Sequence, residues 1–139
     1  MAMSDTFELT VLPEPYVVTR LDPRSAAPPW ALEGPGFAAI CRTDDELSII
    51  TAEGRVPDPP AAAPRWRGFK VHGPFPFDAI GVLAAISRAL ADARVSLLAV
   101  STHDTDYVFV QSPDLPRAVR ALRHAGHTVH TPVESSPGA

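Results

Sequence analysis

Apolar residues in the C-terminal half of the chain follow the two periods that distinguish strands from helices. The stretch 66–73 (WRGFKVHG) predicts a strand, and Asp78 is a favourable N-cap for the helix that follows it. Helical spacing behind that cap is seen for Ile80, Leu83, Ile86 and Leu90. We expect this helix to end near Ala93.

The rest of this half predicts two more strands, a second helix and a final strand. Residues 95–102 (VSLLAVST) are apolar on both faces, which predicts a central strand of the sheet. A polar turn at 103–105 leads to a strand over 106–111. A helix is expected from Asp114, and a last strand over 127–131. The buried stripe of that helix is Leu115, Val119 and Leu122, with Gly126 as its C′ glycine.

The N-terminal half predicts a weaker copy of the same unit. Four short strands are expected, over residues 7–12, 16–21, 37–42 and 46–51. Pro13 closes the first of them, and the proline-rich stretch 22–36 allows no more than one helical turn, near Trp30.

Together the two halves predict an α/β (α+β) fold of two ferredoxin-like modules. The C-terminal half has the β-α-β-β-α-β order of that unit. We expect one continuous antiparallel sheet with the helices on one face. The expected parts are a first, eroded module (7–56), a proline-rich linker (57–64), a second module (65–131) and a disordered tail (132–139).

Composition excludes several classes of protein. The 139 residues fit one ordinary domain, and the net charge of −4 argues against a nucleic-acid partner. No apolar run reaches the ~20 residues that a membrane helix needs. The N-terminus does not have the pattern of a signal peptide, and the single Cys41 fits a reducing cytoplasm.

Histidine and arginine spacing does not indicate a metal or a nucleic acid. His124, His127 and His130 recur every three residues, but Gly126 separates them, so we expect no metal site. The basic ridge on the last helix is expected to be a solvated face; it consists of Arg117, Arg120 and Arg123. No phosphate-binding glycine signature, dinucleotide fingerprint or catalytic triad is seen, so no cofactor and no catalytic residue are predicted.

The loop 73–83 (GPFPFDAIGVL) is the first candidate for ligand binding. It runs from a strand into a helix N-terminus, where free backbone N–H groups stabilise a carboxylate. Gly81 would let a ligand approach the backbone closely, and Asp78 would cap the helix or accept an ammonium group. In the alternative interpretation Asp78 is only an N-cap and Gly81 only a packing glycine. The predicted ligand-binding residues of this loop are Asp78, Ile80, Gly81 and Val82.

The second candidate is the run 101–106 (STHDTD), which concentrates hydroxyls, carboxylates and an imidazole. Its predicted ligand-binding residues are Ser101, Thr102, His103, Asp104, Thr105 and Asp106. Such acids clamp a cation or act as an acid–base pair; the alternative is a plain polar hairpin. Thr43 and Glu46 are the counterparts in the first half, again with a solvated turn as the alternative. We expect the two segments of the second half to lie at opposite ends of the sheet, so that a pocket needs the other module or a second chain.

Several motifs occur in order along the chain: TDDELSI at 43–49, WRGFKVHGP at 66–74, Gly81 to Ala84 with Ile86 and Ser87, and STHDTDYVFV at 101–110. They resemble those of small bacterial tandem-ACT proteins, an ACT variant also present in the cytosolic arginine sensors of animals. The resemblance extends from about Leu9 to Val129. It implies paired ACT modules, effector binding at the loop 73–83, and an amino acid bound at a module interface.

Three hypotheses follow for the function. The first is a cytoplasmic regulatory or sensor module that binds an amino acid and forms a homodimer or a higher homo-oligomer. The second is a small lyase or isomerase that uses His103, Asp104 and Asp106 in a repurposed pocket. The third is an oligomeric interaction module without a ligand.

Overall fold

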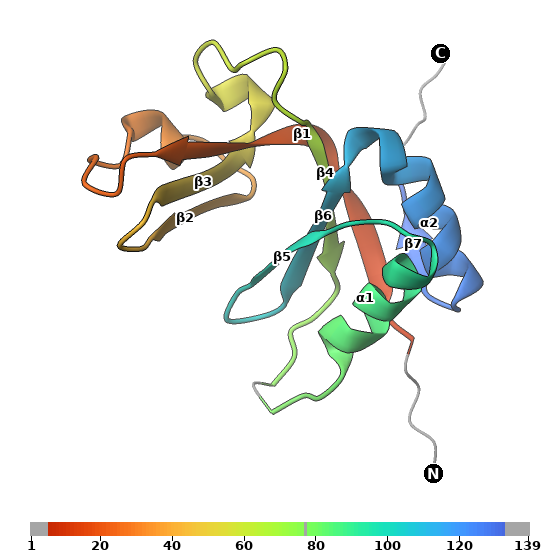
Figure 1. The fold of residues 1–139 in the computed structure, drawn as a ribbon. Helices are drawn as coiled ribbons and strands as arrows, with labels where there is room; N and C mark the ends of the chain where they lie inside the picture. Colours follow the sequence, from red (N-terminus) through yellow and green to blue (C-terminus); the bar gives the residue numbers. More distant parts are fainter. Residues whose placement is uncertain (1–5, 77, 133–139) are drawn as a thin grey trace. The chain divides into compact units, whose positions relative to one another are not determined.

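The structure, a computed structural model, describes residues 6–76 and 78–132 and divides the chain into two compact units (Figure 1). One unit comprises residues 1–13 and 67–139 and contains both α-helices; it is called the helical unit below. The other comprises residues 14–66 and is called the strand unit.

The helical unit has the predicted β-α-β-β-α-β order. Its first three elements are β4 (Trp66–Val71), α1 (Val82–Asp92) and β5 (Leu98–Ser101). The next three are β6 (Asp106–Gln111), α2 (Leu115–His124) and β7 (Thr128–His130), with a 3₁₀ turn (Ser112–Asp114) before α2. The ferredoxin-like order predicted for this half is therefore confirmed.

Strand β1 (Glu8–Leu21) is one continuous strand of 14 residues, so the prediction that Pro13 closes a short strand is wrong. The strand changes partners where its prolines lie. Glu8 to Thr10 pair with β7 in parallel, and the antiparallel register with β3 begins at Tyr16. Because proline has no N–H to donate, it is tolerated where a ladder is interrupted.

Strand β5 lies at the edge of the sheet, so the prediction that 95–102 form a central strand is wrong. In the helical unit the order is β7, β1, β4, β6 and β5, and among the described strands β5 pairs with β6 alone. In a split β-α-β unit the third strand inserts between the two strands that the helix connects, which leaves the second at the edge. Ala99 and Ser101 are accordingly exposed, while Val95, which precedes the strand, packs into the core.

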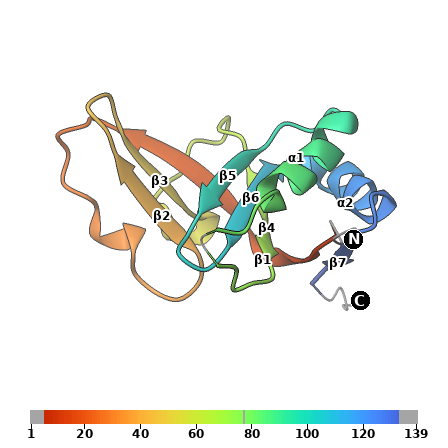
Figure 2. The same cartoon turned by 90° about the horizontal axis from the view of Figure 1, so that it is seen from below.

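One face of these strands packs against both helices, which lie side by side (Figure 2). The strands contribute alternate apolar residues to this core: Leu9, Val11, Phe69, Val71, Val108, Val110 and Val129. Helix α1 contributes Ile86 and Leu90, and α2 contributes Ala118 and Leu122, all without exposed surface. The alternate apolar residues of the strands and the helically spaced residues of α1 and α2 therefore form one layer of buried side chains.

Helix α2 has the predicted bounds, whereas α1 begins later than predicted. Its N-cap is Gly81, with φ of 86°, and no side chain caps it. Asp78 is therefore not the N-cap. Ile80 lies outside the helix with 94% of its surface exposed, which corrects its assignment to the buried stripe.

The strand unit contains β2 (Ala38–Arg42), β3 (Leu47–Ala52) and the C-terminal part of β1, all antiparallel. Two 3₁₀ turns (Pro29–Ala31 and Glu53–Arg55) complete it, the first of them at the predicted turn near Trp30. Residues 14–66, all of which are described, include no α-helix, so the β-α-β-β-α-β order is observed once. The interpretation of this half as an eroded module stays a prediction.

Neither α1 nor α2, the two α-helices of the described residues, is long and apolar enough to span a membrane. The predicted disorder of 132–139 falls almost entirely outside the described residues.

Candidate functional site

A pocket of about 320 Å³ lies in the helical unit, between the loop after β4 and the turn between β5 and β6. Its lining comprises Phe75, Pro76, Ala79 and residues 81–84 on one side and residues 101–106 on the other. The two candidate segments thus meet within one unit, and our expectation that they lie at opposite ends of the sheet is wrong. The helical crossover makes β5 run in the same direction as β4. The C-terminal ends of both strands therefore lie at the same end of the sheet.

Two hydrogen bonds hold these segments together. The Phe75 N–H donates to the Asp104 carbonyl over 2.8 Å. The Thr105 hydroxyl, which is buried, donates to the Val71 carbonyl over 2.6 Å. The turn itself is closed by the N–H of Thr102, which donates to the Thr105 carbonyl over 2.8 Å. Thr102 and Thr105 therefore shape the pocket, and their hydroxyls already have partners.

Gly73 permits the close approach of the two segments. A Cβ atom at this position would lie 2.9 Å from the Asp104 carbonyl oxygen and 3.1 Å from the Phe75 nitrogen. Any other residue would push the loop away from the turn. We did not predict this role, because the Gly–Pro pair indicates a turn without showing what packs against it.

The N-terminus of α1 supplies the hydrogen-bond donors of the pocket. Residues 82–84 form its first turn, and their N–H groups precede the first intrahelical bond, which runs from Ala85 to Gly81. The positive end of the helix dipole lies at the same place. A Cβ on Gly81 would meet nothing within 4 Å, so its positive φ, rather than crowding, favours glycine here.

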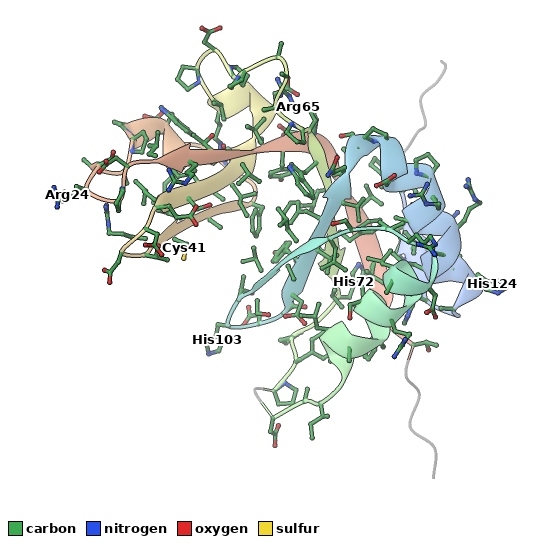
Figure 3. The ribbon with its side chains drawn as sticks, viewed as in Figure 1. Arg24, Cys41, Arg65, His72, His103 and His124 are labelled. Carbon is green, nitrogen blue, oxygen red and sulfur yellow. The ribbon has the colours of Figure 1, made fainter. Side chains whose placement is uncertain are left out.

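The turn between β5 and β6 supplies the acceptors. The Asp106 carboxylate accepts a hydrogen bond from the Ser101 hydroxyl over 2.6 Å. The Asp104 carboxylate lies 3.0 Å from the His103 Nδ1, and both side chains are mostly exposed. His103 lies at the tip of the turn (Figure 3). The pocket therefore joins a donor-rich helix end to two carboxylates.

An apolar wall completes the site. Phe75 and Leu83 pack against the core of the helical unit and also line the pocket. Neither residue was among the predicted site residues. The alternation of proline and phenylalanine in GPFPF is the signal that points to this wall.

Four predicted site residues do not line this pocket. Asp78 and Ile80 are exposed outside it, and Thr43 and Glu46 belong to the strand unit. The Thr43 hydroxyl accepts hydrogen bonds from the N–H groups of Asp45 (3.0 Å) and Glu46 (3.2 Å). These are the local hydrogen bonds of a polar turn, and a ligand-binding role for Thr43 and Glu46 stays a prediction.

The three spaced histidines do not converge. The His127 Nδ1 accepts a hydrogen bond from the Phe7 N–H over 3.0 Å, and burial lowers the pKa of this imidazole. His130 instead pairs with Glu8, whose pKa is lowered mainly by that hydrogen bond. Within 6–76 and 78–132, no group of three or more His, Cys, Asp or Glu side chains is arranged to hold a metal ion.

Comparison with known proteins agrees with this architecture. Residues 61–124 match the family model of an ACT domain, and residues 14–59 match a family described as an N-terminal domain. The fold and the pocket thus define an ACT-domain protein. The chain belongs to the family of Atu0741 from Agobacterium tumefaciens, whose crystal structure is known. The two sequences are 34% identical, and the structures superpose with a TM-score of 0.82 over 96% of this chain and 98% of that one.

Two further solved structures share the fold. VC0802 from Vibrio cholerae, described as a protein of unknown function and possible transport protein, is 19% identical, with a TM-score of 0.67 over 82% of this chain and 85% of that one. Aspartate kinase from Clostridium acetobutylicum is 13% identical, with a TM-score of 0.60 over 84% of this chain and 34% of the kinase. No curated protein matches this chain.

An ACT domain is a ligand-binding regulatory module. That class of function, with a small molecule as the ligand, is what the domain indicates for this chain.

Proposed function

We propose that this protein is a regulatory module that binds a free α-amino acid in the pocket of the helical unit. One observation carries the proposal: the uncapped N-terminus of α1 and the carboxylates of Asp104 and Asp106 line the same pocket. A zwitterion has the complementary pair of charges on neighbouring atoms.

The ligand's carboxylate is assigned to the N–H groups of residues 82–84, where the helix dipole stabilises an anion without a basic side chain. Its ammonium group is assigned to Asp106, which Ser101 orients, in place of the exposed Asp78. The side chain then faces Phe75 and Leu83. A volume of about 320 Å³ is at the small end of ligand pockets, which favours a small amino acid.

Two further points support the proposal. The aspartate kinase of similar fold is described as an allosteric enzyme for amino acid production. The resemblance to ACT proteins also implies paired modules, so we include a homodimer in the proposal. The lyase or isomerase alternative has less support, since His103 and Asp104 have 82% and 72% of their side chains exposed and do not enclose a substrate.

A thermal-shift screen against the proteinogenic amino acids tests the proposal, followed by calorimetry. A ligand at 100 times its dissociation constant adds about 2.7 kcal/mol to the free energy of unfolding. Asp106→Asn should weaken binding roughly 10- to 100-fold, because it removes a charge-assisted hydrogen bond. Asp45→Asn, on an exposed turn of the strand unit, is the matched control. If no amino acid stabilises the protein, or if both variants bind like the wild type, the proposal is wrong.

A further inference from the structure

A second hollow lies between the two helices, on the surface of the helical unit. Helices α1 and α2 leave an open groove of about 490 Å³ between them. Four alanines of the two helices and their C-caps line it: Ala89, Ala93, Ala121 and Ala125. No residue of this groove lines the pocket assigned to the amino acid.

The two rims of the groove carry opposite charge. On α1 the rim residue is Asp92, whose recorded partner is Arg88 at 3.8 Å, with both side chains more than two-thirds exposed. On α2 the rim carries Arg120 and His124. The side chain of neither has a hydrogen bond or an ion pair to any residue that the structure describes, and His124 lies on the outer side of α2 (Figure 3). Arg117 differs, because it pairs with Asp114 at 3.0 Å.

We propose that this groove is the surface through which two copies of the chain associate. A two-fold axis along the groove brings α1 of one copy opposite α2 of the other. Asp92 of each copy then faces Arg120 and His124 of the second copy, and the two contacts are identical by symmetry. The interface is therefore complementary to itself, as a closed dimer requires.

Two features make a second copy the fitting occupant. Asp92 lies on one rim and Arg120 and His124 lie on the other, so two copies packed face to face place unlike charges together. Alanine side chains allow helices to pack at the short end of the usual 8–10 Å separation.

Charge reversal tests this arrangement by sedimentation of the full-length protein. We expect the wild type to be dimeric at a concentration on the order of 50 μM. Asp92→Arg and Arg120→Asp should each raise the dimer dissociation constant at least about tenfold, because like charges then face each other twice. An equimolar mixture of the two variants should form the heterodimer, since the reversed charges at positions 92 and 120 are again opposite where the two copies meet.

The controls separate association from folding and from ligand binding. Arg24→Asp reverses an exposed charge in the strand unit and should leave the dissociation constant unchanged. A cation near the C-terminus of α1 is favourable to the helix dipole and offsets the loss of the exposed pair with Arg88, so α1 should stay folded in Asp92→Arg. A monomeric wild type, or a dimer that neither reversal weakens, overturns the inference. A mixture that stays monomeric overturns the proposed pairing, and amino acid binding by the variants is a separate readout.

Discussion

The side-chain hydroxyl of Thr105 donates a hydrogen bond to the backbone carbonyl of Val71 over 2.6 Å, and this bond joins the turn between β5 and β6 to the end of β4. The two residues are 34 positions apart in the chain, and Thr105 is 7% exposed. The bond holds both walls of the candidate pocket together at one end of the sheet. Its removal is therefore the most direct test of how the pocket is built.

Replacing Thr105 with valine should lower the free energy of unfolding by about 1–3 kcal/mol, because the Val71 carbonyl loses its partner in a buried site. Thr105→Ser keeps the hydroxyl and should lose less. Urea unfolding of the two variants checks the difference. Equal stability of the valine variant and the wild type would mean that water replaces the bond.

Gly73→Ala should displace the loop after β4. Its new Cβ would lie 2.9 Å from the Asp104 carbonyl oxygen, so the variant should lose stability and amino acid affinity together. Gly54→Ala is the matched control, since a Cβ there meets nothing within 4 Å, and it should be neutral. Unfolding and calorimetry on the pair give the answer. An alanine at 73 that changes neither quantity would contradict the observed contact.

Gly81→Ala tests the N-cap of α1 in a different way. Because φ is 86° and the space beside Gly81 is open, the substitution should cost about 1 kcal/mol through backbone strain alone. Asn tolerates this conformation better, so Gly81→Asn should lose less stability. Affinity measured at a temperature where both variants are folded should match the wild type. A selective loss of affinity would instead mean that the ligand approaches Gly81 itself.

Stability should fall as the pH is lowered from 7.5 to 5.5. Burial lowers the pKa of His127 in the folded state below its ordinary value of 6.5, so the unfolded state binds more protons in acid. The stabilisation is complete above about 6.5 and decreases as the pH falls from that value towards the folded pKa. The Glu8 carboxylate, whose pKa is also lowered, adds a second decrease below about 4.5.

His127→Gln, which has no titrating group, should be less sensitive to pH over the same range. Urea unfolding at several pH values, compared between this variant and the wild type, checks the prediction. Parallel curves for the two proteins would assign the acid sensitivity to another group.

Predictions that depend on neighbours in the chain agree well with the structure. Helix α2 begins at Leu115 and ends before Gly126, as its apolar stripe and its glycine indicate. The start of α1 was predicted less well. Asp78 is a residue type that is favoured at N-caps, but the observed N-cap is Gly81, three residues later. Residue preference identifies several possible caps, and only the path of the backbone selects one.

The candidate site was predicted in part. Of the predicted ligand-binding residues, Gly81, Val82 and the run 101–106 line the pocket, whereas Asp78, Ile80, Thr43 and Glu46 do not. The run 101–106 was selected for its chemistry, which is visible in one short segment. The close contact of Gly73 with Asp104 was not predicted, because it joins residues that are distant in the chain.

The sequence by itself determined the order of the strands and helices in the helical unit, since the periods of 2 and 3.6 are local properties of the backbone. Only the tertiary structure decided that β5 is an edge strand, that β1 continues through Pro13 to a new partner, and that the end of β4 meets the turn after β5. Each of these features depends on contacts between segments that are far apart in the chain. Strand neighbours are chosen by packing across the whole sheet, so no short stretch of the sequence encodes them.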